Sequence, residues 1–104
     1  MKEVNVQFIN EKTKNAFEDT EDPLKKSLER AFDDIKKSPF CGIQIPKKII
    51  PKEYIKRYNV QNLWKYNLPD AWRLLYSIQG GEIVIFAILL EWLDHKNYER
   101  RFNY

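Results

Sequence analysis

Two apolar segments near the C-terminus, separated by adjacent glycines, constrain the fold of this chain most strongly. In the first segment, apolar residues occupy alternate positions, as in a strand with two different faces: Trp72, Leu74, Tyr76 and Ile78. The second segment, residues 83–90, is continuously apolar, as in a central strand that is covered on both faces. Gly80 and Gly81 suit the positive φ angles of a two-residue hairpin. We therefore predict strands at residues 71–79 and 82–91.

Two more segments, residues 3–9 and 63–68, alternate apolar and polar residues and are also predicted to be strands. Proline and aspartate after residue 68 favour a tight turn into the next strand. Pairing across that turn can place Lys65 and Arg73 on one face of the sheet, since alternate residues of a strand share a face. We expect Arg73 to be exposed there, and the neighbouring aromatic residues to lie on the opposite face.

Helical signals lie between the first strand and the others. Asn10 can cap a helix over residues 11–18. Asp22 as an N-cap, followed by Pro23 at the first helical position, is typical of the start of a second helix, residues 23–37. The second helix has one apolar stripe: Leu24, Leu28, Ala31, Phe32 and Ile35. This order of elements predicts an α+β fold, with an N-terminal helical hairpin packed on one face of a mainly antiparallel sheet.

The chain has 104 residues, which suits a single domain spanning residues 1–104. Its one cysteine excludes an intramolecular disulfide, and one histidine with scattered carboxylates falls short of a zinc ligand set, so we expect neither metal nor cofactor. The longest apolar run is too short to cross a bilayer, and the first ten residues lack the apolar core of a signal peptide. We therefore expect a cytoplasmic protein with no membrane partner.

Basic residues gather in the middle of the chain. Residues 40–73 contain seven lysines and arginines against two acidic residues, interleaved with tyrosines and tryptophans. Five of these cations fall in the connector before the second strand: Lys47, Lys48, Lys52, Lys56 and Arg57. Cations that hold phosphates beside rings that stack on bases are typical of a nucleic-acid surface. The same pattern also fits a solvated basic face, and charge alone leaves both interpretations open.

Four residues could carry chemistry on RNA. Lys65 and Arg73, if neighbours, could hold a phosphate and stabilise charge that develops on it. His95 and Tyr98, just beyond the last predicted strand, are residue types that move protons in phosphodiester cleavage. Each also has a purely structural interpretation: the cations as a solvent-facing strand surface, His95 as a helix cap, and Tyr98 as a ring packed on the sheet edge.

The last 40 or so residues resemble a known family. The segment 63–78, with its core Trp72-Arg73-Leu74-Leu75-Tyr76, precedes a Gly-Gly turn, an apolar strand and His95-Lys96-Asn97-Tyr98. This order resembles the RelE/ParE toxin superfamily, most of all its RelE-type messenger-RNA interferases. The resemblance implies the RelE-like fold, a helical hairpin on a twisted sheet.

The resemblance also implies a function. Such proteins are toxins of type II toxin–antitoxin systems, and they cut messenger RNA in the ribosomal A site without a metal, using the RNA 2′-hydroxyl as nucleophile. A cognate antitoxin protein silences them. Carried over by position, Arg73 matches the arginine that contacts the scissile phosphate, Lys65 a strand lysine, Tyr98 the C-terminal tyrosine, and His95 the histidine that some relatives have before it.

The sequence departs from the family pattern at two places. Asn67 stands where well-studied members have a second lysine, and Trp92 or Leu93 stands near the position of an arginine that leaves the last strand. Arg100 and Arg101 are candidates to replace that arginine and to bind RNA. The alternatives are a non-nuclease toxin of the same fold, such as a ParE-like gyrase inhibitor, and a catalytically degenerate interaction protein.

Overall fold

The computed structural model describes residues 2–103 of the chain. These residues form five strands: β1 (Glu3–Phe8), β2 (Ile43–Gln44), β3 (Trp64–Asn67), β4 (Arg73–Gly80) and β5 (Val84–Leu93). They also form four α-helices: α1 (Glu11–Glu18), α2 (Leu24–Lys37), α3 (Lys52–Tyr58) and α4 (His95–Phe102). Two short 3₁₀ helices lie in the connections, η1 (Lys47–Ile49) and η2 (Pro69–Ala71).

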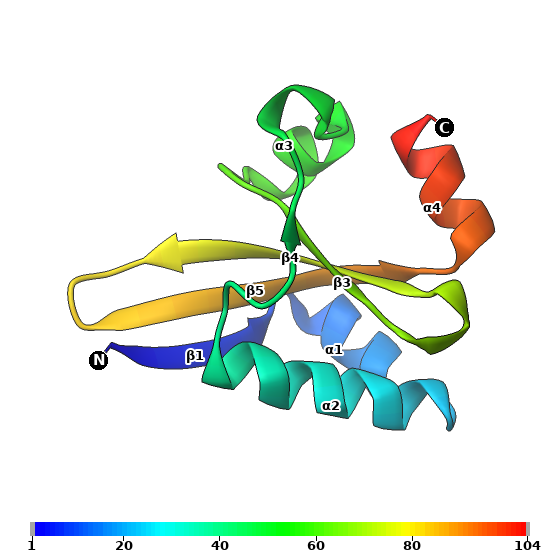
Figure 1. Cartoon of the computed structure of the whole chain (residues 1–104), viewed down its shortest axis with the longest axis horizontal. Coiled ribbons are helices and arrows are strands. Elements are labelled where there is room, and N and C mark those ends of the chain that lie inside the picture. The colour runs from blue at the N-terminus through cyan, green and yellow to red at the C-terminus, as the bar shows by residue number, and fades with distance from the viewer. Residues whose placement is uncertain (1, 104) are drawn as a thin grey trace.

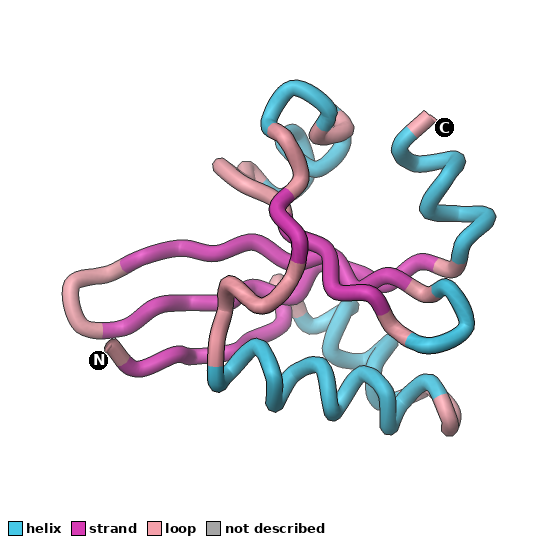
Figure 2. The backbone as a smooth tube through the Cα atoms, viewed as in Figure 1, coloured by secondary structure: helices cyan, strands magenta, loops and turns pink. Residues whose placement is uncertain are grey.

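The five strands form one twisted sheet in the order β1-β5-β4-β3-β2 (Figure 2). β1 runs parallel to β5, and the other three pairings are antiparallel. The predicted α+β class, the helical hairpin and the mainly antiparallel sheet are therefore confirmed. β2, with only two residues, escapes prediction, because so short a strand has no periodicity to detect.

Helices cover both faces of the sheet, which differs from the single helical layer that the sequence predicted. In Figure 1, α1 and α2 lie below the sheet, and α3 and α4 lie above it. α2 lies against β1, and its fully buried residues Leu28, Ala31 and Ile35 share one core cluster with residues of β4 and β5. On the other face, Tyr54 of α3 and Tyr98 of α4 belong to a second core cluster. The sheet is thus buried on both sides.

One of the two predicted helix caps is confirmed and the other is wrong. The side-chain oxygen of Asn10 accepts a hydrogen bond from the Thr13 amide at 2.8 Å, which satisfies one of the free N–H groups at the start of α1. Asp22 does not cap α2. That helix begins at Leu24, directly after Pro23, with no side-chain hydrogen bond at its N-terminus.

The hairpin between β4 and β5 turns two residues later than the glycines predicted. β4 continues through Gly80, which pairs with Ile85, and the Gly81 amide donates to the Val84 carbonyl at 2.8 Å. The turn therefore falls on residues 82–83. No glycine among residues 2–103 has a positive φ, so the predicted use of the Gly80-Gly81 pair is wrong. β5 also extends past the predicted end, to Leu93, and so brings Glu91 and Trp92 into the sheet.

A hydrogen bond between β3 and α2 makes the free energy of unfolding change with pH in the alkaline range. The Tyr66 hydroxyl donates to Asp34 Oδ2 at 2.5 Å, and this bond, with a smaller effect of burial, raises the pKa of Tyr66 to about 12. An unfolded tyrosine titrates near pH ~10. The folded state therefore holds its proton more tightly, and this contribution is complete below pH ~10 and lost as pH rises through about 12.

We therefore expect Tyr66→Phe to unfold with a weaker pH dependence between pH ~9 and ~11 than the parent. Urea unfolding at the two pH values measures this, and Tyr58→Phe, which removes a hydroxyl on the other side of the sheet, is the matched control. An equal loss of stability in the parent and Tyr66→Phe would show that Tyr66 does not contribute.

Candidate functional site

The two predicted phosphate-binding cations share one face of the sheet. In the antiparallel pairing of β3 with β4, Lys65 pairs with Leu75 and Asn67 pairs with Arg73. Directly paired residues project to the same side, and so do alternate residues of one strand, such as Lys65 and Asn67. Lys65 and Arg73 therefore both lie on the face opposite α2. Trp64 and Tyr66, at the alternate positions, pack in the core on the α2 side. The predicted parity is therefore confirmed.

A tyrosine from α4 brings these cations together. Lys65 Nζ lies 5.3 Å from the centroid of the Tyr98 ring, and the Arg73 guanidinium carbon lies 5.4 Å from it. The ring is only 3% exposed and stacks on Phe102 at 4.5 Å. Each cation is within range of attraction to the negative face of the ring. Three of the four predicted catalytic residues thus meet, although they come from β3, β4 and α4.

Arg73 is half-buried, not exposed as expected. Its Nη1 donates to the Trp72 carbonyl at 3.3 Å, and its Nε is buried with no hydrogen-bond partner. A buried N–H group without a partner is costly, and on a guanidinium it is a strong donor to an anion. The α4 layer, which the sequence did not predict to cover this face, explains the lower exposure.

His95 lies at the same end of the sheet but outside the Tyr98 cluster. It is the first residue of α4, two positions after Leu93, which pairs with Arg73. Its side chain is 61% exposed, and its Nε2 lies 2.5 Å from Glu99 Oε1, one helical turn later. α4 is capped by Asp94, whose carboxylate accepts from the Asn97 amide at 2.9 Å. The cap and Glu99 together fix where the imidazole points.

The predicted RNA-binding cations are spread over three helical segments. Lys47 and Lys48 lie in η1, Lys52, Lys56 and Arg57 in α3, and Arg100 and Arg101 in α4. All are exposed except Arg101, whose side chain is 24% exposed. The two α4 arginines therefore differ, because Arg100 is open to solvent and Arg101 is held within the protein.

Arg101 is the centre of a charged cluster that the sequence did not predict. Its Nη1 donates to Glu91 Oε2 at 2.6 Å, its Nε lies 3.4 Å from Glu53 Oε2, and its guanidinium lies over the Tyr54 ring at 5.6 Å. Burial lowers the pKa of Arg101, but Glu91, Tyr54 and Glu53 raise it by more. Burial and the nearby Glu91 raise the pKa of the Tyr54 hydroxyl, so it stays protonated. The cluster ties α3 and α4 to β5.

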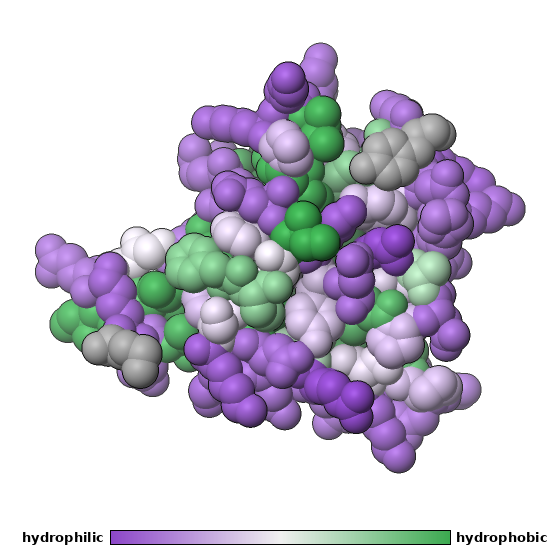
Figure 3. All heavy atoms as spheres, viewed as in Figure 1, coloured by the Kyte–Doolittle hydropathy of each residue, from purple (hydrophilic) through white to green (hydrophobic). Residues whose placement is uncertain are grey.

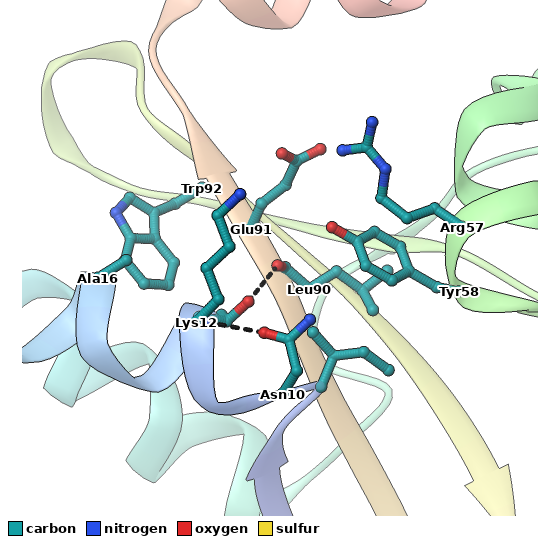
Figure 4. Close-up of a pocket in the computed structure, with 10 residues that line it drawn as sticks. Asn10, Lys12, Ala16, Arg57, Tyr58, Leu90, Glu91 and Trp92 are labelled. Carbon is teal, nitrogen blue, oxygen red and sulfur yellow. Dashed lines mark hydrogen bonds between the residues drawn. The ribbon is translucent and has the colours of Figure 1, made fainter.

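A groove of about 680 Å³ lies on the other side of Glu91 (Figure 4). One wall is α1, the other is α3, and the floor is the end of β5. β1 ends at Phe8, so the edge of β5 that faces β1 has no strand partner beyond Leu89. α1 crosses here, and Thr13 Oγ1 donates to the Leu90 carbonyl at 3.3 Å. Lys12 and Arg57 extend from opposite walls toward Glu91. Sequence reasoning missed Lys12, because nothing distinguishes it from other lysines of an exposed helix.

Metal clusters and membrane-spanning helices are both absent from the part of the chain that the structure describes. Within residues 2–103, no three histidine, cysteine or acidic side chains are grouped as a metal site. The longest helix in this range, α2, has 14 residues, and no helix here has the length and apolar character needed to cross a membrane.

Comparisons with known proteins identify the fold. No family model and no curated protein sequence matches the chain. Among solved structures, a mutant of the E. coli toxin RelE in the free state is similar, with a TM-score of 0.56 and 14% sequence identity. The match covers 99% of this chain and 96% of that one. The RelE-like architecture that the sequence resemblance implied is therefore confirmed, and this chain has the fold of the RelE toxin.

Proposed function

We propose that this protein is a type II toxin that cuts messenger RNA in the ribosomal A site without a metal. The observation that carries the proposal is the convergence of Lys65 and Arg73 on the Tyr98 ring. Two cations held over one ring suit a phosphate group. The likeness in fold to a protein named as a toxin supports the same function.

In the proposed reaction the RNA supplies its own nucleophile. The 2′-hydroxyl oxygen bonds to the adjacent phosphorus, the bond from phosphorus to the 5′-oxygen breaks, and a cyclic phosphate remains. Arg73 and Lys65 stabilise the charge that builds on the phosphate oxygens. His95 takes the proton of the 2′-hydroxyl and returns it to the leaving 5′-oxygen, because it is an exposed imidazole at this end of the sheet. Tyr98 is the alternative proton carrier, and its buried ring supports a positioning role for both cations.

A cognate antitoxin is the proposed protein partner, and the cytoplasm the proposed location. The face shown in Figure 3 has apolar residues in its middle, where the chain passes from α2 toward α3. Phe40 and Ile43 in that segment are 57% and 52% exposed. Apolar side chains exposed next to each other are typical of a surface that a partner covers.

Induced expression tests the proposal. We expect growth arrest, with messenger fragments that end in a 2′,3′-cyclic phosphate and map to codons in the A site. Co-expression of the cognate antitoxin should restore growth. Arrest without any messenger cleavage would contradict the nuclease.

One observation favours a second function, inhibition of DNA gyrase by a toxin of the same fold. In the sheet register, the residues paired directly with Arg73 are Asn67 and Leu93, so Lys65 is joined by no further cation at these two positions. Fewer cations at the phosphate weaken the case for cleavage. Loss of gyrase supercoiling activity in the presence of the purified protein, with messenger RNA intact, would support this second function.

The exposed lysines of η1 and α3 give a prediction for binding. Neutralising four of them together should flatten the salt dependence of RNA affinity: Lys47, Lys48, Lys52 and Lys56. Removing one phosphate contact lowers the slope of log affinity against log salt by about 0.7 for single strands. Fluorescence anisotropy with labelled RNA measures the slope. A matched variant that neutralises four exposed α2 cations, Lys26, Arg30, Lys36 and Lys37, should keep the parent slope. An equal change in both variants would point to net charge alone.

A further inference from the structure

The groove between α1 and α3 carries a surplus of positive charge. Lys12 and Arg57 are exposed and reach over β5 from opposite walls (Figure 4). Glu91 is the acidic residue of the lining, and Arg101 already pairs with it at 2.6 Å. Glu53, which also faces Arg101, is part of the same cluster and does not line the groove. Arg101 therefore largely balances the negative charge of Glu91, and the positive charges of Lys12 and Arg57 remain available to an anionic ligand.

Aromatic rings accompany these cations. Tyr58 of α3 and Trp92 of β5 line the groove, and both are half-buried, so each presents part of its ring. Cations that follow a phosphate backbone, next to rings on which bases stack, are the usual means of holding single-stranded nucleic acid. The same combination of two cations and a ring recurs at Lys65, Arg73 and Tyr98.

The groove adjoins the Lys65 and Arg73 site through the sheet. Lys65 pairs with Leu75, and Leu75 pairs with Glu91, so these three residues form one row across β3, β4 and β5. Neighbouring strands are about 4.8 Å apart, which places the backbone at Glu91 about 10 Å from that at Lys65. A few nucleotides of RNA span this separation.

We infer that the groove is a second RNA-binding subsite, which holds a nucleotide close to the one bound at Lys65 and Arg73. This inference rests on the proposed function and adds to it the length of RNA that the protein contacts. Lys12 and Arg57 bind the phosphate on either side of that nucleotide, and Trp92 or Tyr58 stacks on its base. RNA is favoured over an acidic peptide because each cation has a ring near it. Tyr58 accompanies Arg57 on the α3 wall, and Trp92 of the floor lies beside the α1 wall that carries Lys12.

The test measures how affinity grows with RNA length. Fluorescein-labelled 2′-O-methyl oligoadenylates of three, five and seven nucleotides resist cleavage and are titrated with the full-length protein, with anisotropy as the readout. In the parent, affinity should rise with length. In Lys12→Gln/Arg57→Gln, most of that gain should disappear, and the salt slope for the longest oligonucleotide should fall by about 0.7 for each phosphate that is no longer bound.

The matched control is Lys14→Gln/Arg30→Gln, which removes two exposed cations that do not line the groove. This control should keep the parent length dependence. Two further variants, Trp92→Leu and Tyr58→Leu, each remove one ring of the groove. One of them should weaken binding of the longest oligonucleotide by roughly 5- to 150-fold, the cost of losing a stacked base, and parent affinity in both would overturn the stacking.

The outcomes separate this inference from the proposed function. If the parent cleaves messenger RNA while the groove variant binds every length as the parent does, the subsite is wrong and the proposed function stands. If the groove variant binds RNA normally but loses affinity for the purified antitoxin, the groove is a protein interface and the inference fails. If the parent does not cleave messenger RNA but the length dependence still requires Lys12 and Arg57, the subsite stands and the nuclease fails.

Discussion

Arg73→Ala is expected to lower the rate of messenger-RNA cleavage by about 10²–10³-fold, the usual cost of losing one charge-stabilising donor. The physical reason is the position of its guanidinium, which lies beside Lys65 over the Tyr98 ring and has a buried Nε without a partner. An interaction with the phosphate that strengthens in the transition state lowers kcat when it is lost, more than it raises KM. Single-turnover cleavage of ribosome-bound messenger RNA measures the rate, and growth arrest should disappear with it.

Two controls show whether the loss is specific to the site. Arg30→Ala removes an exposed arginine of α2, on the opposite face of the sheet, and should remain toxic. The melting temperature of Arg73→Ala should change little, because the lost attraction to Tyr98, about 0.5–2 kcal/mol, is offset by removing a buried unpartnered N–H. Full toxicity of Arg73→Ala with unchanged messenger cleavage would place the reaction elsewhere on the protein.

His95→Ala is expected to lower cleavage by about 10²–10⁴-fold, the usual contribution of a proton-transfer residue. His95 is open to solvent and lies two residues after Leu93, the strand partner of Arg73, so bound RNA can reach it. The pH–rate profile should lose one limb in the variant, because the group that titrates has been removed. Glu99→Gln, which keeps the size of the neighbour that contacts His95, should retain cleavage. An unchanged pH profile in His95→Ala would exclude His95 as the proton carrier.

Two substitutions at Tyr98 distinguish its role from that of His95. Tyr98→Phe keeps the buried ring that holds both cations and should cleave at close to the parent rate. Tyr98→Leu keeps an apolar side chain but removes the aromatic face, so Lys65 and Arg73 lose the group that positions them. Its cleavage should fall while its circular dichroism stays that of a folded protein. A loss of about 10² or more in Tyr98→Phe would instead assign the proton transfer to the Tyr98 hydroxyl.

Local periodicity was sufficient to predict most of the sheet and the α2 helix. Alternation in β3 and β4 already determined that Lys65 and Arg73 share a face, because register across a short turn leaves few choices. The apolar stripe of α2 predicted which residues are buried, and Leu28, Ala31 and Ile35 are fully buried. These predictions held because each depends on residues that are close in the sequence.

The parts of the site that depend on distant residues could not be predicted. Arg101 meets Glu53 and Glu91 only because α3 and α4 fold onto the same face, and no spacing in the sequence encodes that contact. The sequence placed Arg101 among the RNA-binding cations for its charge, and the structure shows that its charge is already paired. The Gly80-Gly81 turn failed for a different reason, because two residues of extra strand pairing outweighed the conformational freedom of glycine.

The parallel pairing of the first strand with the last determines when this protein can fold during synthesis. Glu3 pairs with Val84 and Phe8 with Leu89, so β1 cannot find its partner until the intervening helices and strands and then β5 have been made. Contacts between such distant residues form late, since a long loop must close before they contribute. α4, which completes the cluster around Arg73, follows β5 and emerges later still. A nascent chain therefore lacks the cluster of Lys65, Arg73 and Tyr98 until both β5 and α4 have been made.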